Sequence, residues 1–295
     1  MRRRFGWSLL ALGAMGCGSE PPDPAPPVAQ ERRAVASLDG VPIAFGSRGA
    51  GPTALVLVHD WGCDSSYWGL QTEAFVAGYR VVAIDLAGHG RSGSDRADWS
   101  VDAFAGDVRA VVEALDLPRV VLVGHSMGGP VVLAAAAGMP ERVVGVVVVE
   151  TLHDVERFSH GASAPEWIEQ AERDFPAACD QLVRGLFRDD APAELVFRVS
   201  TDVCSQDPDL AVQLGRLLSE YDAVEGVRAV RAPVRAINSD RIPTAVDVNR
   251  KYAPGFEAVV LDRVGHFPML EHPDRFNAAL AAVLDALPPA ASGDR

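Results

Sequence analysis

Short apolar runs alternate with amphipathic stretches from residue 32 onward. Asp39-Gly40 is a strong hairpin signal, so residues 32–47 are predicted to form an antiparallel strand pair at the start of a sheet. Continuous apolar runs predict buried strands at residues 54–58, 81–84, 120–123, 143–149, 234–237 and 258–261. The patterns between them predict helices at residues 65–77, 101–115, 130–138, 243–252 and 273–287. This alternation is typical of an α/β fold around a mainly parallel sheet flanked by helices.

One segment interrupts the alternation. Residues 151–231 contain no strong β run, but several amphipathic pieces carry large apolar side chains, among them Trp167, Phe175, Leu186, Phe197 and Leu214. The pattern predicts a helical cap inserted after the sixth core strand. Residues 32–150 and 232–288 would then form the core, and residues 151–231 the cap.

The first 31 residues differ from the rest. A basic start, Met1-Arg2-Arg3-Arg4, precedes a short apolar stretch that ends in small residues at Gly16-Cys17. Residues 1–17 resemble a bacterial lipoprotein signal peptide, which implies cleavage before Cys17, a lipid on Cys17 and a Pro-rich tether over residues 18–31. The four residues that end this stretch, Ala14-Met15-Gly16-Cys17, begin with Ala where the lipoprotein pattern usually has Leu. An ordinary export signal, cleaved nearby, is therefore the alternative. We expect a cell-envelope lipoprotein that faces the periplasm, or else a soluble periplasmic or secreted protein.

Composition narrows the class of partner. The chain has 295 residues, of which 48% are hydrophobic and 23% charged, as in ordinary globular proteins. Its formal net charge of −13 disfavours binding to nucleic acid and to an anionic membrane surface. We therefore expect a small-molecule substrate, with membrane contact only through the N-terminal lipid. The sequence does not determine the oligomeric state.

Three cysteines remain after Cys17. Cys179 and Cys204 lie in the same middle segment and are candidates for a disulfide in an exported protein. Spacing does not prove this pairing. Cys63 is left over and is interpreted as a buried free thiol.

The clearest chemical motif is Gly124-His125-Ser126-Met127-Gly128, which follows a buried strand and begins a helical pattern. This is the G-x-S-x-G nucleophile elbow in its expected strand–turn–helix context. Glycines are needed because the serine backbone is strained and neighbouring chain passes close to it. Ser126 is therefore the predicted nucleophile.

With this motif in place, the chain resembles the α/β-hydrolase superfamily over roughly residues 32–287. His59-Asp60-Trp61-Gly62 stands where the family commonly has His-Gly, and the backbone amides of Trp61 and Met127 would form the oxyanion hole. Asp60 departs from the family pattern, and its carboxylate should point away from the hole or be hydrogen-bonded. His59 is expected to brace this loop.

Two further motifs match the family in order. The segment from Asp85 to Ser92 is similar to its D-x-x-G-x-G-x-S turn, whose Asp and Arg are usually structural, so His89 is not expected to be catalytic. His266 follows the last strand, where the family places its catalytic histidine. It is the predicted general base that takes the Ser126 proton.

The acid of the triad is less clearly marked. Asp240 follows a strand and a short turn in the usual order Ser, acid, His, and it is the first choice. The turn is shorter than the common form of the family. Asp247 on the next helix, and Glu150 after the sixth strand, where some members keep their acid, remain alternatives.

The resemblance implies a serine hydrolase that cleaves a small or medium hydrophobic ester, lactone or thioester through an acyl-enzyme. Ser126 excludes the relatives that use Asp at this position, the epoxide hydrolases and haloalkane dehalogenases. No cofactor or metal is expected. Cofactor-free perhydrolases and carbon–carbon bond hydrolases share the triad, and a ligand-sensing protein on a hydrolase scaffold is the alternative of another class.

Overall fold

The computed structural model describes residues 31–157 and 165–287. The predicted signal peptide, Cys17 and almost all of the predicted tether lie outside the described residues. Among the helices that are described, none is long and apolar enough to cross a bilayer.

The core is an eight-stranded sheet with the strand order β1-β2-β4-β3-β5-β6-β7-β8. The hairpin predicted at Asp39-Gly40 joins β1 and β2, which pair antiparallel, and β2 is also antiparallel to β4. All other neighbours pair in parallel. The strands span β1 Glu31–Ala36, β2 Pro42–Arg48, β3 Ala54–Val58, β4 Arg80–Ile84, β5 Val120–His125, β6 Val143–Val149, β7 Val234–Ser239 and β8 Glu257–Leu261.

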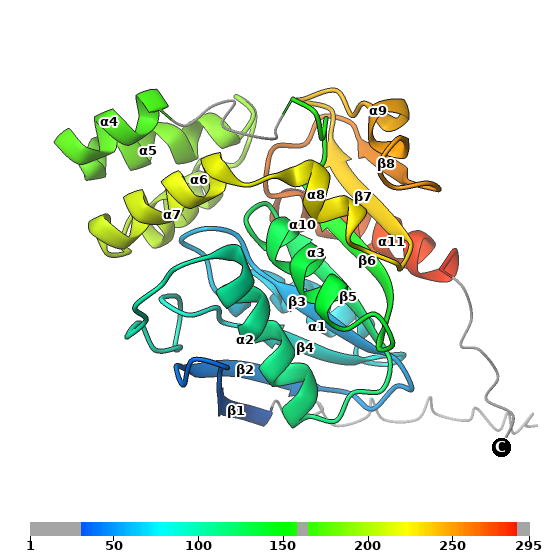
Figure 1. Ribbon diagram of the computed structural model, residues 1–295. Coiled ribbons are helices and arrows are strands. Elements are labelled where there is room, and N and C mark those ends of the chain that lie inside the picture. Colours follow the sequence, from blue (N-terminus) through cyan, green and yellow to red (C-terminus); the bar gives the residue numbers. More distant parts are fainter. Residues whose placement is uncertain (1–30, 158–164, 288–295) are drawn as a thin grey trace, which may run out of the picture.

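Helices cover both faces of the sheet, as Figure 1 shows. On one face α2 (Val101–Ala114) packs against α3 (Gly128–Gly138), and on the other α1 (Gly69–Phe75) packs against α11 (Pro273–Asp285). Every residue of β3 and β5 is buried, because both faces of these central strands are covered. The short elements are η1 Ser65–Trp68, α9 Val246–Arg250 and α10 Pro268–Glu271.

The described residues between β6 and β7, in the segment predicted to be a cap, contain five helices. They are α4 Pro165–Arg173, α5 Phe175–Leu186, α6 Ala193–Val203, α7 Pro208–Glu220 and α8 Ala223–Arg228. The first four pack against one another in a layer beyond the carboxyl ends of the strands, whereas α8 packs against α3 in the core (Figure 1). A disulfide between Cys179 and Cys204 ties α5 to the end of α6, which confirms the predicted pair, and Cys63 is a buried free thiol.

The turn after β4 is structural, as expected. Asp85 is buried and accepts hydrogen bonds from the backbone amides of Ser65 and Arg91 and from the Arg91 side chain. His89 is buried beside this turn, and its Nδ1 lies 2.9 Å from the carbonyl oxygen of Ala87. These contacts hold the loop behind the site and leave His89 out of it.

Candidate active site

The nucleophile elbow has the geometry that its glycines predict. Ser126 follows β5 with a φ of 49°, and its amide donates to the carbonyl of Val149 at 2.9 Å. A Cβ on Gly124 would lie 2.1 Å from the carbonyl oxygen of Gly128, and one on Gly128 would lie 2.6 Å from that of Val58. Any larger residue at these positions would push the serine out of place. The side chain of Ser126 is half-buried, at the start of α3.

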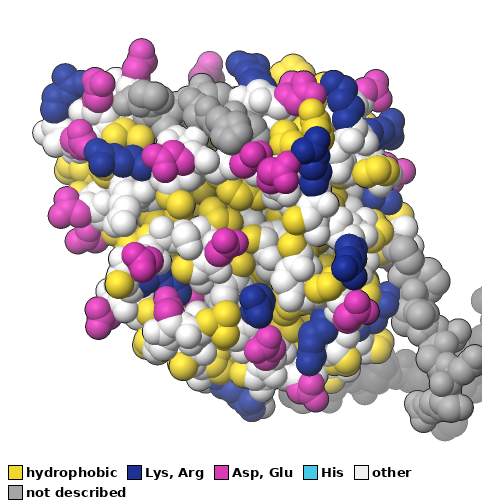
Figure 2. All heavy atoms as spheres, in the orientation of Figure 1, with side chains coloured by type: hydrophobic (Ala, Val, Ile, Leu, Met, Phe, Trp, Pro, Cys, Tyr) yellow, Lys and Arg dark blue, Asp and Glu magenta, His cyan; other side chains and the backbone are white. Residues whose placement is uncertain are grey.

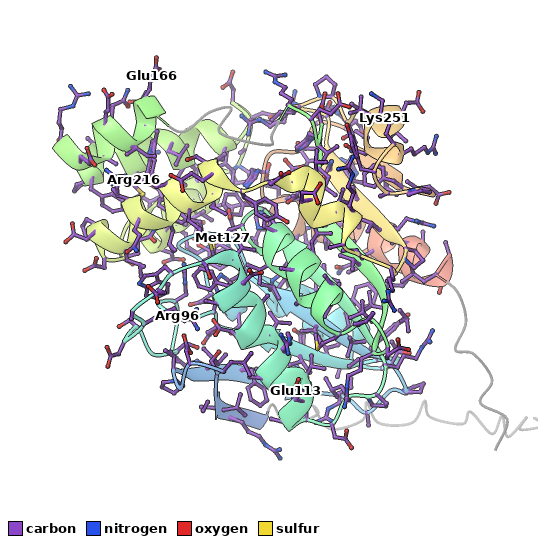
Figure 3. The ribbon with its side chains drawn as sticks, viewed as in Figure 1. Arg96, Glu113, Met127, Glu166, Arg216 and Lys251 are labelled. Atoms are coloured by element: carbon purple, nitrogen blue, oxygen red, sulfur yellow. A yellow bond between two sulfur atoms is a disulfide. The ribbon has the colours of Figure 1, made fainter. Side chains whose placement is uncertain are left out.

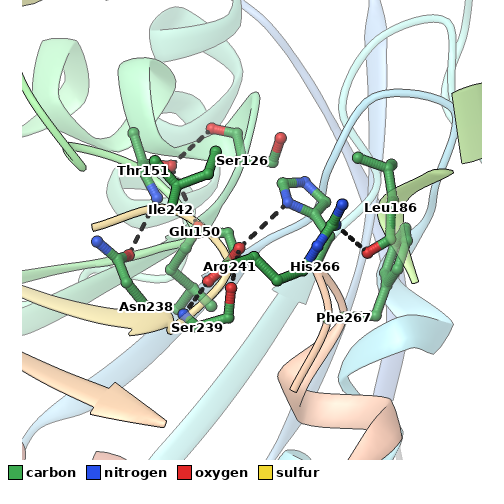
Figure 4. Close-up of polar contacts among 12 residues, drawn as sticks. Ser126, Glu150, Thr151, Leu186, Asn238, Ser239, Arg241, Ile242, His266 and Phe267 are labelled. Atoms are coloured by element: carbon green, nitrogen blue, oxygen red, sulfur yellow. Dashed lines mark hydrogen bonds and ion pairs between the residues drawn. The ribbon is translucent and has the colours of Figure 1, made fainter. Parts of the chain in front are cut away.

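His266 lies in the loop between β8 and α10, and this loop is fixed from several sides. Its amide donates to the carbonyl of Leu186 at the end of α5, and its own carbonyl oxygen lies 2.7 Å from Nε2 of His125. Glu271 accepts hydrogen bonds from the amides of Gly265 and Phe267 on either side. The imidazole is therefore held at the carboxyl edge of the sheet, beside the elbow (Figure 4).

The predicted acid, Asp240, is not beside His266, and this expectation is corrected. Its Oδ1 accepts hydrogen bonds from Arg188 at 3.1 Å and from the amide of Arg263 at 3.0 Å, at the surface. Asp247 is further out, with a side chain that is 97% exposed and paired with Arg250 of its own helix.

Glu150 takes that position instead, as the alternative from the sequence had it. Its Oε2 lies 3.4 Å from Nδ1 of His266, and the side chain is only 3% exposed. The amide and hydroxyl of Ser239 both donate to its carboxylate (Figure 4). The sequence contained one signal for this role: Glu150 directly follows the apolar run of β6. A carboxylate that is buried at the end of such a strand needs a hydrogen-bond or ion-pair partner.

The two amides expected to form the oxyanion hole converge on one point. Trp61 N and Met127 N lie 2.7 Å and 3.1 Å from a single oxygen, Oδ1 of Asp60. The other oxygen of this carboxylate, Oδ2, lies 3.5 Å from Nε2 of His266. Asp60 is thus hydrogen-bonded, as expected, but its acceptor occupies the point between the two amides.

His59 braces the loop as predicted. Its Nδ1 lies 2.7 Å from the carbonyl oxygen of Asp60, and its Nε2 accepts from the amide of Leu86 after β4. The ring is buried and contacts the ring of His89. Burial lowers the pKa of His59, so the neutral ring joins the ends of β3 and β4.

His266 lies between two carboxylates, which set its charge. Burial alone would lower the pKa of His266, but the hydrogen bonds to Asp60 and Glu150 outweigh burial and raise the pKa to about 9. In turn, His266 holds the pKa of Asp60 and Glu150 below their usual range, although burial alone would raise both. At neutral pH the site therefore holds an imidazolium between two carboxylates.

Asp60, His125 and His266 also form a group whose potential ligand atoms lie within 4.8 Å of one another. Asp60 and His266 pair with each other, and Nε2 of His125 lies against the His266 carbonyl oxygen. Burial lowers the pKa of His125 to about 4, so it is neutral at pH 7. Because these atoms already have protein partners, we treat the group as a hydrogen-bonded cluster and assign it no metal.

A cavity of about 480 Å³ opens onto these groups between the sheet edge and the cap. Its apolar wall joins core residues to cap helices, and Trp61 packs edge-on against Trp167 of α4 while its indole N–H donates to Ala211 of α7. Figure 3 places Met127 at the start of α3, facing the cap, and Figure 2 shows apolar side chains gathered in the hollow between cap and core. The apolar lining includes Trp61, Leu133, Leu152, Trp167, Leu182, Leu186 and Leu218.

Comparison with known proteins agrees with this architecture. The model of the alpha/beta hydrolase family matches residues 55–279, which include the elbow, Glu150 and His266. Among solved structures, Est816, described as an N-acyl homoserine lactone degrading enzyme, superposes with a TM-score of 0.73 at 26% identity. That match covers 84% of this chain and 98% of the other.

Curated relatives match this chain over different lengths. A 2-hydroxy-6-oxononadienedioate/2-hydroxy-6-oxononatrienedioate hydrolase of Paraburkholderia phymatum is 28% identical over 81% of this chain and 89% of its own length. An uncharacterized protein of Mycobacterium tuberculosis is 39% identical over 127 residues, which are 43% of this chain and 36% of that protein. This chain thus matches about a third of the longer relative. The family model covers most of the chain, and the protein belongs to the alpha/beta hydrolase family.

Proposed function

We propose that this protein is a serine hydrolase that cleaves a small or medium hydrophobic ester, lactone or thioester through an acyl-enzyme. One observation carries the proposal. The strained serine of the elbow and the His266–Glu150 pair line the same apolar cavity. This combination supplies a nucleophile, a base and an acid partner in the order that the family uses.

In the proposed reaction, the Ser126 oxygen attacks the carbonyl carbon while Nε2 of His266 takes the hydroxyl proton. The carbon–oxygen or carbon–sulfur bond to the leaving group then breaks, and His266 returns the proton to that group. Water repeats the sequence on the acyl-enzyme, which releases the acid and the free serine. Glu150 holds Nδ1 of His266 and stabilises the imidazolium that forms in each step.

The cavity bounds the substrate class. At about 480 Å³ it lies within the range that holds a small organic molecule, and its lining offers mainly dispersion and hydrophobic contact. The similarity to an N-acyl homoserine lactone degrading enzyme and to a 2-hydroxy-6-oxononadienedioate/2-hydroxy-6-oxononatrienedioate hydrolase supports a hydrolytic reaction here. Perhydrolysis and carbon–carbon bond cleavage on this triad remain the alternative enzymatic functions.

The test is hydrolysis of p-nitrophenyl esters of increasing acyl length by the wild type and by Ser126→Ala and His266→Ala. We expect both substitutions to lower kcat by about 10³-fold or more. Ser219→Ala is the matched control, because Ser219 lines the same cavity but only donates to a carbonyl of its own helix, that of Arg216. Activity that persists in Ser126→Ala, with the fold intact by circular dichroism, would refute the serine mechanism.

A second candidate, a ligand-sensing protein on this scaffold, is favoured by one observation. The carboxylate of Asp60 accepts from both amides that a hydrolase would offer to its oxyanion. A fluorophosphonate probe separates the two functions, because it labels only an activated serine. Labelling of Ser126 supports the hydrolase, and its absence at every pH at which the protein is folded supports the sensor.

We also propose that the chain is exported and lipidated at Cys17. The disulfide between Cys179 and Cys204 supports an oxidising compartment. Metabolic labelling with a palmitate analogue in bacteria should mark the wild type and spare Cys17→Ser, while fractionation reports the compartment. Recovery of unlabelled wild-type protein in the cytosol would contradict both parts of this proposal.

A further inference from the structure

Asp60 occupies a position that the proposed hydrolase needs for its substrate. We propose that the Asp60 carboxylate is an internal competitor for the oxyanion hole, so that a substrate carbonyl binds only when this carboxylate leaves the two amides. The proposal rests on the function given above and names the residue that limits its rate and sets its pH range.

The first argument is the position of Oδ1. It lies 2.7 Å from Trp61 N and 3.1 Å from Met127 N, the separations that an oxyanion would have from its two donors. Two oxygens cannot share this point, because each needs its own hydrogen-bond distance and both would carry negative charge. Asp60 and the tetrahedral intermediate are therefore mutually exclusive there.

The second argument is the position of Oδ2. It lies 3.5 Å from Nε2 of His266, the nitrogen that must accept the Ser126 proton. Among the described contacts, the Ser126 hydroxyl has no hydrogen bond to that nitrogen. One carboxylate thus withholds both the oxyanion donors and the base from the nucleophile.

His266 keeps a carboxylate partner when Asp60 moves away. Glu150, at the end of β6, faces Nδ1 of His266. The ring of His266 also contacts the ring of His125, which is buried and neutral. His153 contacts Glu150 from the loop after β6, and Glu271 accepts the amides on either side of His266. Arg241, which also lines the cavity, donates to carbonyls at the end of α5. Glu150 alone keeps the imidazole oriented when Asp60 leaves.

The hole itself does not depend on the Asp60 side chain. The indole of Trp61 is held by the carbonyl of Ala211 at 3.1 Å and by the edge of Trp167, so its amide is fixed from the cap. Met127 is fixed by the first turn of α3. Removal of the carboxylate should leave two open donors that still converge on one point.

The pKa of His266, raised to about 9, follows in part from Asp60 and adds a pH dependence. Below this pKa, His266 is an imidazolium that holds the Asp60 carboxylate in place and cannot accept the Ser126 proton. Above this pKa, His266 is neutral, its ion pair with Asp60 is lost, and it can act as the base for Ser126. We therefore expect wild-type ester hydrolysis to rise up to about pH 9. Without the Asp60 charge, the rise should come at lower pH.

The experiment compares kcat/KM for p-nitrophenyl acetate between pH 5.5 and 10 in the wild type, Asp60→Gly and Asp60→Asn, with the Ser126→Ala rate subtracted in each background. We expect Asp60→Gly to raise kcat/KM at pH 7 about 10- to 100-fold and to lower the midpoint of the pH profile by about two pH units, since each unit is worth a factor of ten. Asp60→Asn should also lower the midpoint of the pH profile, but its kcat/KM should increase less than that of Asp60→Gly. The reason is that the Asn amide oxygen can still accept hydrogen bonds from the amides of Trp61 and Met127.

Asp240→Asn is the matched control, because Asp240 follows β7 at the same edge of the sheet but lies at the surface, outside the cavity lining, where its carboxylate accepts from Arg188 and from the amide of Arg263. It removes one negative charge near the site and should leave the rate and the profile within about twofold. Fluorophosphonate labelling of Ser126 at pH 7 is a second readout. Its rate should be lowest in the wild type, higher in Asp60→Asn and highest in Asp60→Gly. Thermal melting checks that each variant is folded, and the near-isosteric Asp60→Asn keeps the test open if Asp60→Gly does not fold.

The outcomes separate the two proposals. Wild type and Asp60 variants with equal, Ser126-dependent rates and equal pH midpoints overturn the role of Asp60 and leave the serine hydrolase standing. A lower rate in Asp60→Gly and Asp60→Asn also overturns it, because Asp60 would then assist the reaction. Absence of Ser126 labelling and of Ser126-dependent hydrolysis in all variants at all pH values overturns the hydrolase together with this inference.

Discussion

Four described residues that closely follow the carboxyl ends of strands adopt positive φ angles although none is glycine. They are Ser126 at 49°, Glu150 at 52°, Leu152 at 55° and Arg263 at 53°. Such a conformation costs of order 1–3 kcal/mol at each position and persists only where surrounding contacts enforce it. Here the amides of Ser126 and Glu150 donate to the ends of the neighbouring strands, at Val149 and Ile237. The strain therefore falls on the proposed nucleophile and on the carboxylate that faces the proposed base, His266.

At this scale Glu150 and Asp240 make a matched comparison. Glu150→Gln should lower kcat for ester hydrolysis by about 10²- to 10⁴-fold, because a neutral amide neither stabilises the imidazolium nor fixes its tautomer. Asp240→Asn should change kcat less than about threefold, since the Asp240 carboxylate accepts from Arg188 and the Arg263 amide at the surface and does not line the cavity. Steady-state kinetics on one ester measures both.

The reverse result, a large loss in Asp240→Asn and none in Glu150→Gln, would contradict the assignment of the acid. A titration of the His266 ring protons by NMR gives an independent check. Glu150→Gln should lower the pKa of His266, because one of its two carboxylate partners has been neutralised.

Among the elements, α5 and α6 carry the cap side of the site. The carbonyl of Leu186, at the end of α5, accepts from the amide of His266, and Leu182 and Leu186 line the cavity. The disulfide from Cys179 to Cys204, 25 residues apart, holds the two helices together. Cap architecture and the position of the base are therefore coupled through one covalent link and one hydrogen bond.

The double substitution Cys179→Ala and Cys204→Ala should lower the free energy of unfolding by about 2–4 kcal/mol, since an open loop of this length gains entropy in the unfolded chain. Guanidinium unfolding followed by circular dichroism measures the change. Dithiothreitol should destabilise the wild type by a similar amount and leave the double variant unchanged. Equal sensitivity of both proteins to the reductant would show that the bridge is not the cause.

Over the whole molecule, the shifted pKa values of buried histidines make stability depend on pH. Burial lowers the pKa of His89 to about 3 and of His125 to about 4, so both are neutral in the folded protein. Their contribution to stability is complete above the ordinary value of 6.5 and is lost as pH falls toward these values. The raised pKa of His266 acts in the opposite direction, with a contribution that is complete below 6.5 and lost as pH rises toward 9.

The melting temperature should therefore be highest near pH 6.5 and fall toward both pH 4.5 and pH 9. Asp60→Asn should flatten the alkaline side, because His266 then gains less from being charged in the folded state. Calorimetry or fluorescence melting over pH 4.5–9 measures both curves. A wild-type profile that rises steadily from pH 6.5 to pH 9 would be incompatible with a charged His266 in the fold.

The sequence by itself determined the features that local pattern controls. The apolar runs of β3, β5 and β6 could only be buried strands, and the alternation with helices required a mainly parallel sheet. Ser126 and His266 could be predicted as site residues because each stands in a short motif whose backbone geometry depends on neighbouring glycines. Cys179 and Cys204 could be named only as candidates for a disulfide, and the structure joins them.

Only the tertiary structure decided which carboxylates meet the base. Glu150 and Asp240 both follow strands that end at the same edge of the sheet, so their sequence positions are almost equivalent. Burial and the Ser239 donors direct Glu150 to Nδ1 of His266, whereas Arg188 holds Asp240 at the surface. The place of Asp60 likewise depends on the Met127 amide and the His266 imidazole, which come from segments far apart in the chain. Side-chain direction and distant hydrogen-bond partners leave no local pattern, and folding alone brings them together.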